Sequence, residues 1–548
     1  MISAQAATDP APPGAAPGAA RAVLRTRWAL LLSLAGGAAL AAAFPPAGAW
    51  PLAVAGPAAL AVALAGRSLR GSLLCGLVFG TAFFLPLLSW LLNVAWYAWA
   101  VLAAAETVIF ALLTVGQRLL LRLRFWPAAV AGWWVATEGV RDRWPWAFPW
   151  GRLAMSQAGA PTARWMAIGG APWLTFLIAL IGALIAWAVL RMAGTGGTTA
   201  AARRRVAAWL WPAAGAGAVL AIALVPLDPV GHAPTAQVAA IQGDVPRARN
   251  LPQQLSEIQV TANHAATTAK LAAGVKAGRR PAPDIVLWPE NATDIDPLTD
   301  PGIHAEISAA VSQIGRPVLV GEVRENPRRN VGQLWTPAGG PGGMYIKRRL
   351  VPFGEYIPLR GFISAFTSLP SLVPINFTPG RSAVVFKVGQ IRLGDVICYE
   401  VGFDDLVRSE VTAGANLLTV QSNDADFEID GQTGESEQQV AMARLRAIES
   451  DRAVVYVSST GESAIIAPDG QVITRSGLWQ QAILQARVPL VSYRTLADRA
   501  GSWPEYVIIA LTALTLVTTI GFGFFPAGSM RWSSLRNLLE KEADRARQ

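Results

Sequence analysis

Apolar residues are gathered in long runs over the first part of the chain and again near its end. A run of about 20 apolar residues is long enough to cross a bilayer as a helix. Eight runs are found, at residues 27–44, 48–66, 70–92, 94–115, 125–140, 172–192, 207–226 and 505–526. The pattern therefore predicts a helical membrane domain of about eight spans, of which the short, tryptophan-rich fifth is the least regular.

Between residues 231 and 500 the pattern changes to short apolar stretches separated by longer amphipathic ones. Such alternation predicts strands and helices in turn, which is typical of a layered α/β domain. Strands are expected at Gln237–Ile241, Asp284–Leu287, Pro317–Gly321, Gly343–Ile346, Ile391–Ile397, Asn416–Val420 and Ala453–Ser458, and helices at Leu251–Gly274, His304–Ile314, Phe403–Thr412 and Glu435–Asp451. The glycines of 339–343 suggest a hairpin turn before Tyr345–Lys347.

These patterns divide the chain into five segments. A disordered tail is expected at 1–20, the membrane domain with spans one to seven at 21–230, the α/β domain at 231–500, the eighth span at 501–530 and a second tail at 531–548. Arg21, Arg25 and Arg27 before the first run also fit a cleaved signal peptide. Further spans follow at once, which favours an uncleaved first helix.

The net charge of +10 is carried by the short segments between the apolar runs. Arginines follow the second, fourth, sixth and eighth runs, whereas the loops after the first and third runs contain no Lys or Arg. By the positive-inside rule both termini are cytoplasmic, and residues 226–504 lie on the outer face. Acidic and basic residues nearly balance between Thr235 and Ala500, so nucleic acid is not expected as a partner.

Cysteine and histidine are too few and too scattered for a disulfide framework or a metal site. Cys75 lies in an apolar run, and Cys398 is the only thiol of the α/β domain. His232, His264 and His304 show no metal-ligand spacing. We therefore expect neither a metal nor a cofactor.

Three reactive side chains each stand at the end of a predicted strand. Glu290 follows Pro289, and a carboxylate there would have a raised pKa and could act as a general base. Lys347 could stabilise an oxyanion. Cys398 lies between a strand and a helix start, where backbone N–H groups favour a thiolate nucleophile. Taken singly, they could equally be a surface glutamate, a basic turn and a buried structural cysteine.

The order of these segments resembles the Glu–Lys–Cys triad of the nitrilase superfamily. More narrowly, the chain resembles the apolipoprotein N-acyltransferase family from about residue 25 to 526. The matching segments are Leu350–Leu359 (LVPFGEYIPL), Ile397–Glu400 (ICYE), Gln242–Pro246 (QGDVP), Ser422–Asp424 (SND) and Met442–Ala447 (MARLRA). The resemblance implies an αββα sandwich for the α/β domain.

The resemblance also implies roles for individual residues. Glu290 would be the base, Lys347 the stabiliser of the transition state and Cys398 the nucleophile. Glu355, Glu400 and Tyr399 would support the site or line its pocket. Two departures put substrate contacts in doubt: Asp426 stands where many members carry an aromatic residue, and the segment after Pro246 lacks a tryptophan.

The activity implied is a two-step acyl transfer in the bacterial cytoplasmic membrane, with the α/β domain on the periplasmic side. Cys398 would take an acyl chain from a glycerophospholipid and pass it, from a thioester, to the N-terminal amine of a diacylglyceryl-cysteine lipoprotein. The bilayer and both lipid substrates are the expected partners. Two alternatives remain open: a membrane-tethered amidase or nitrilase using the same triad, and a catalytically idle scaffold for a partner enzyme.

The segment 362–377 is unusually apolar for a loop of a soluble domain. It could pack over the core of its own domain. It could also be a lid that dips into the outer leaflet and admits lipid chains, with Phe366 and Leu369 as its contacts.

Overall fold

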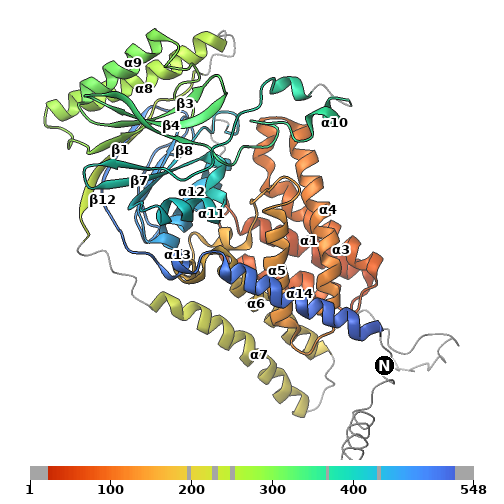
Figure 1. The fold of residues 1–548 in the computed structure, drawn as a ribbon. Helices are drawn as coiled ribbons and strands as arrows, with labels where there is room; N and C mark the ends of the chain where they lie inside the picture. The colour runs from red at the N-terminus through yellow and green to blue at the C-terminus, as the bar shows by residue number, and fades with distance from the viewer. Residues whose placement is uncertain are drawn as a thin grey trace, which may run out of the picture.

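The computed structural model describes residues 23–193, 199–224, 233–246, 253–365, 369–428 and 434–524. The two predicted tails, 1–20 and 531–548, and Phe366 lie outside these residues. Figure 1 shows a helical bundle joined to a domain built on two sheets. The division into bundle and sheets follows the change of pattern along the chain.

A helix forms in every apolar run. The helices are α1 (Thr26–Ala42), α2 (Ala55–Leu64), α3 (Leu69–Leu87), α4 (Trp96–Leu120), α5 (Trp126–Arg141), α6 (Met166–Ala193), α7 (Thr199–Leu220) and α14 (Trp503–Phe524). Small residues let them pack closely: a Cβ on Gly76 would lie 2.8 Å from the Cα of Ala111.

Within the described residues, three helical stretches are long and apolar enough to cross a membrane. They are α3, α4 and Pro161–Met192, which contains α6. Shorter apolar helices occupy Thr26–Ala42, Trp50–Leu64, Trp209–Leu220 and Trp503–Thr519. These helices indicate an integral membrane protein, while the count of eight spans stays a prediction.

The domain on two sheets has six strands in each sheet. The first sheet has the order β12-β1-β2-β3-β4-β5, and the second has the order β11-β10-β9-β8-β7-β6. Parallel pairing joins β1 to β2 and β2 to β3 in the first sheet, and β7 to β8 and β8 to β9 in the second. The strands of the first sheet are β1 (Thr235–Gln242), β2 (Ile285–Leu287), β3 (Val318–Arg324), β4 (Arg329–Thr336), β5 (Gly340–Ile346) and β12 (Ala482–Pro489). Those of the second are β6 (Val385–Val388), β7 (Ile391–Ile397), β8 (Leu417–Ser422), β9 (Val454–Ser458), β10 (Ala464–Ile466) and β11 (Val472–Arg475).

Two pairs of helices complete the layers. α8 (Gln253–Lys276) and α9 (Pro301–Ile314) cover the outer face of the first sheet, and α11 (Asp404–Thr412) and α12 (Glu435–Ser450) cover the second (Figure 1). One apolar cluster fills the space between the sheets, and another fills the space under α8 and α9. This arrangement is the expected αββα sandwich. The short helices α10 (Arg360–Ser364) and α13 (Leu496–Ala500) lie in connections.

The predicted strands and helices are all present, but five strands were missed: β4, β6, β10, β11 and β12. Arg329–Thr336 carries polar residues on both faces, and β6 and β11 are only four residues long, so their apolar periodicity is weak. The glycine hairpin is confirmed with one correction. Gly340–Gly343 already belongs to β5, so the turn lies before these residues.

The sandwich and the bundle share one hydrophobic core. A single cluster of buried side chains runs from α1, α3 and α6 into α12 and the second sheet. Because α12 lies between that sheet and the bundle, almost every position along it is buried. The sheet that carries Cys398 is therefore the one that faces the membrane helices.

Candidate active site

The three predicted side chains come together between the two sheets. Glu290 follows β2, Lys347 follows β5 and Cys398 follows β7, and all three are buried. The Nζ of Lys347 lies 2.9 Å from Oε1 of Glu290. The ends of strands from both sheets thus bring an acid, a cation and a thiol to one place.

The Glu290 carboxylate is held by three donors. Its Oε1 accepts hydrogen bonds from Lys347 Nζ and from Asn330 Nδ2 at 2.6 Å, and its Oε2 accepts from the backbone N–H of Asn423 at 3.0 Å. Burial raises the pKa of Glu290, and the Lys347 ammonium only partly opposes this effect. A carboxylate with a raised pKa is a stronger proton acceptor than an exposed one.

Lys347 donates to a second carboxylate as well. Its Nζ lies 3.1 Å from Glu355 Oε1, and Asn330 Nδ2 also donates to that oxygen at 2.9 Å. Burial by itself lowers the pKa of Lys347, but Glu290 and Glu355 outweigh it and hold the pKa well above its usual range. Lys347 therefore stays an ammonium, and two of its three N–H groups are taken up by these carboxylates.

Cys398 occupies a strained backbone position. Its φ of 52° is in the left-handed region, which costs a residue other than glycine about 1 kcal/mol. The strain is typical of a functional turn between a strand and a helix. Gln439 Nε2 donates to its Sγ at 3.5 Å.

The surroundings of Cys398 oppose the thiolate expected from its position in the chain. Burial first, and then the Glu290 carboxylate, raise the pKa of the Cys398 thiol well above its usual range, although Lys347 opposes them. The α11 helix begins only at Asp404, beyond the turn Cys398–Gly402. The N-terminus of α11 therefore does not adjoin Cys398, and the thiol lies near the Glu290 carboxylate.

Glu400 links the nucleophile turn to the lysine segment. One oxygen accepts from the backbone N–H groups of Arg348 and Arg349 at 2.7 and 2.9 Å. The other accepts from Tyr345 Oη at 2.7 Å and from the N–H of Ile397 at 2.9 Å. Glu400 is fully buried, and it fixes the backbone directly after Lys347 and directly before Cys398.

Tyr399 faces the bundle. Its ring stacks on Trp150 with centroids 5.4 Å apart, and its hydroxyl donates to the carbonyl of Ala147 at 2.6 Å. Both partners belong to the tryptophan-rich segment that follows α5. Trp144 of that segment is exposed, whereas Trp150 is buried under the nucleophile turn.

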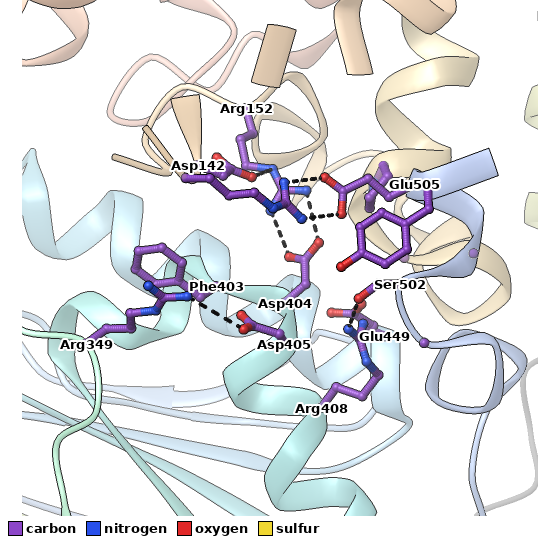
Figure 2. Close-up of a pocket in the computed structure, with 16 residues that line it drawn as sticks. Asp142, Arg152, Arg349, Phe403, Asp404, Asp405, Arg408, Glu449, Ser502 and Glu505 are labelled. Carbon is purple, nitrogen blue, oxygen red and sulfur yellow. Dashed lines mark hydrogen bonds and ion pairs between the residues drawn. The ribbon is translucent and has the colours of Figure 1, made fainter. Parts of the chain in front are cut away.

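A buried ion-pair network also joins the bundle to the nucleophile turn (Figure 2). Arg152 makes a two-pronged contact with Asp404, at 2.8 and 2.9 Å. Arg446 of α12 lies 2.6 Å from the same carboxylate and donates to the carbonyls of Val401 and Gly402. Burial would raise the pKa of Asp404, but the two arginines outweigh it and hold the pKa well below its usual range. A cavity of about 300 Å³ lies beside this network.

Breaking this network is expected to lower the stability of the fold. In Arg152→Met, Asp404 loses two charged hydrogen bonds while it stays buried, which costs about 3 kcal/mol or more. The thermal unfolding midpoint of the full chain in detergent should fall. Arg152→Lys, which keeps the charge but loses the fork, should fall less. An unchanged midpoint in Arg152→Met would contradict a structural role for the pair.

The sequence did not identify several residues of this site: Asn330, Asn423, Gln439 and the pair Arg152–Asp404. Asn330 lies on β4, one of the missed strands, and Arg152 is far from the site along the chain. Leu369 lies in a short 3-10 turn of the predicted lid, Leu369–Leu372. Among the described residues, no group of three or more His, Cys, Asp or Glu side chains is arranged to hold a metal ion.

Comparisons with known proteins agree with the two-part architecture. Residues 36–184 match the family model of the apolipoprotein N-acyltransferase N-terminal domain, and residues 237–498 match that of the carbon-nitrogen hydrolases. An amidase from Nesterenkonia sp. aligns with 52% of this chain and 99% of its own at 16% identity, with a TM-score of 0.36, which is too low to carry an argument.

Relatives named apolipoprotein N-acyltransferase match over nearly the whole length. One from Mycolicibacterium smegmatis is 36% identical over 539 residues, which cover 92% of this chain and 87% of the relative. One from Azotobacter vinelandii is 29% identical over 525 residues, with 88% and 94% covered. The chain therefore belongs to the apolipoprotein N-acyltransferase family, whose activity is the N-acylation of lipoproteins.

Proposed function

We propose that Cys398 takes an acyl chain from a glycerophospholipid and transfers it to the N-terminal amine of a diacylglyceryl-cysteine lipoprotein. The buried contact between the Lys347 ammonium and the Glu290 carboxylate, beside a thiol, supports this proposal most directly. The core shared with the bundle supports it further, because both substrates are lipids of the bilayer.

In the first half-reaction Glu290 takes the Cys398 proton while sulfur attacks the ester carbonyl. Lys347 stabilises the negative charge that develops on the carbonyl oxygen. The carbon–oxygen bond of the ester then breaks, Glu290 returns the proton to the leaving alkoxide, and a lysophospholipid departs. The product is an acyl thioester on Cys398.

In the second half-reaction the acceptor amine attacks the thioester. A carbon–nitrogen bond forms, the carbon–sulfur bond breaks, and Glu290 takes a proton from nitrogen. The Cys398 thiolate then recovers its proton from Glu290. Burial of the site keeps water from competing with the amine.

We place the sandwich on the periplasmic side of the cytoplasmic membrane, anchored by the predicted membrane domain of 21–230 and the predicted eighth span of 501–530. The connection between α3 and α4, which contains Trp90, then lies at the outer leaflet. Phe366 and Leu369 are proposed lid contacts for acyl chains. In support, Phe362 and Ile375, which flank them, are 67% and 58% exposed.

The test is the intact mass of the purified chain after incubation with phospholipid vesicles. We expect an adduct of one acyl chain that hydroxylamine removes and that Cys398→Ala does not form. Adduct formation without transfer to a diacylglyceryl-cysteine peptide would favour the amidase or nitrilase alternative, in which water takes the acyl group. No adduct, with lipid untouched, would favour a scaffold.

A further inference from the structure

A second group of buried carboxyls lies beside Cys398, apart from the Glu290 and Glu355 pair. Asp424 follows β8, Glu428 lies four residues later, and Glu435 begins α12. All three are at least 97% buried. None of them was given a role from the sequence or used in the reaction described above, although Asp424 lies in the Ser422–Asp424 segment that resembles the family.

The three carboxyls differ in how well they are satisfied. Asp424 accepts hydrogen bonds from the hydroxyls of Ser422, Ser458 and Tyr456, at 2.6, 2.6 and 3.1 Å. Glu435 accepts from Gln439 at Oε1, and its side chain also shares a hydrogen bond with the Asp424 carboxyl. Glu428 accepts from the N–H of Ser436 at Oε1, while its buried Oε2 has no hydrogen-bond partner among the described residues.

No basic side chain of the described residues forms an ion pair with Glu428 or Glu435, unlike the paired Glu290 and Glu355. Burial, followed by the nearby Asp424 carboxylate, raises the pKa of Glu435 well above its usual range. Burial raises the pKa of Glu428 to about 7. Buried acids that lack a basic partner are stabilised when a cation binds beside them.

Glu435 is linked to Cys398 by hydrogen bonds through one side chain. Gln439 Nε2 donates both to Sγ of Cys398, at 3.5 Å, and to Glu435. Glu435 and Asp424 are among the charges that raise the pKa of Cys398. An ammonium group at Glu435 would therefore lie close to a thioester on Cys398.

The same segment is fixed against the bundle. Asn93 Nδ2 donates to the carbonyl of Phe427 at 2.7 Å, and the rings of Phe427 and Trp90 meet edge to face at 5.2 Å. Trp90 also lies under Gly434, directly before Glu435. The carboxyls thus stand where a molecule anchored by lipid chains beside the bundle could present a polar head to Cys398.

A metal ion does not fit this place, because no three His, Cys, Asp or Glu side chains of the described residues are arranged to hold one. An organic ammonium group needs only one or two carboxylates and a few hydrogen-bond acceptors. The acceptor in the proposed function is such a group, since an α-amino group has a pKa of about 8.

We propose that Glu435, assisted by Glu428, is the binding site for the α-ammonium group of the acceptor, an inference that rests on the proposed function. Glu435 takes one proton from the ammonium, which leaves the neutral amine that attacks the thioester. The carbon–sulfur bond then breaks as described, and Glu435 releases its proton to water. The site selects a cationic amine over water and over neutral nucleophiles.

The test compares two nucleophiles on preformed acyl-enzyme. Wild type and Glu435→Gln are acylated with phospholipid and then mixed with either a diacylglyceryl-cysteine peptide or hydroxylamine, which is uncharged at pH 7. For the peptide, we expect the variant to lose about 30-fold or more in kcat/KM, chiefly through KM, because a buried charge partner is gone. The rate with hydroxylamine should stay within about twofold. Glu435→Asp should recover part of the loss.

Glu437→Gln is the matched control, since it removes one charge from the same helix two residues away and should behave as wild type. Equal loss with both nucleophiles would make Glu435 a structural residue, and no loss with either would remove it from recognition. Both results would overturn the inference. Failure of wild type to form the acyl-enzyme would instead overturn the proposed function, so the two failures are distinguishable.

Discussion

Replacing Glu290 with Gln is expected to slow acylation of Cys398 by phospholipid about 10²- to 10⁴-fold, the range that general base catalysis contributes. The amide keeps the size of the side chain, but its single oxygen can accept from Asn330 or from Asn423 and not from both. It cannot take the thiol proton, and the raised pKa of Cys398 makes unassisted ionisation rare. The initial rate of adduct formation by intact mass measures the effect.

The pH dependence of the acylation rate should distinguish the role of Glu290 from that of other carboxyl groups. Burial raises its pKa above the ordinary 4.5, and only the ionised form accepts a proton. The wild-type acylation rate should therefore rise with pH through a value above 4.5 and level off once the carboxylate is ionised. Glu290→Gln should lack that rise. Glu306→Gln, on α9 away from the site, should keep both the rate and the profile, and wild-type acylation by Glu290→Gln would refute the assignment.

Replacing Lys347 with Met is expected to remove activity and stability together. Loss of the oxyanion stabiliser costs about 10²- to 10³-fold in acylation. The buried carboxylates of Glu290 and Glu355 would also lose the cation between them, at a cost of about 3–5 kcal/mol. The unfolding midpoint in detergent should fall along with the acylation rate.

A double variant separates the two effects of Lys347. In Lys347→Met with Glu355→Gln, only one buried carboxylate remains at that point, so part of the lost stability should return. Acylation should not return, because no ammonium is present near the carbonyl oxygen. Recovery of activity in the double variant would show that Lys347 only balances charge.

The triad was predictable because each member lies next to a recognisable apolar strand, and its motifs resemble one family. Glu400 and Glu355 were also predicted as supporting residues, and the structure surrounds both with backbone and side-chain donors. For Cys398, burial and the Glu290 carboxylate raise the pKa of the thiol and so oppose the thiolate that its position favours. Helix position and local sequence do not report how deeply a side chain is buried or which carboxylate faces it.

The sequence by itself determined the two-part architecture, the strands and helices with strong periodicity, and the choice of Glu290, Lys347 and Cys398 as candidate site residues. Apolar runs and period-two strands are local properties, so they are readable along the chain. Only the tertiary structure decided that Arg152 of the bundle binds Asp404, that Asn330 joins two carboxylates, and that Glu435 stands beside Cys398. Those contacts join residues that are far apart in the chain, and the side chains involved follow no periodic pattern along it. The free energy of each contact also depends on burial, which only the packing of the folded chain creates.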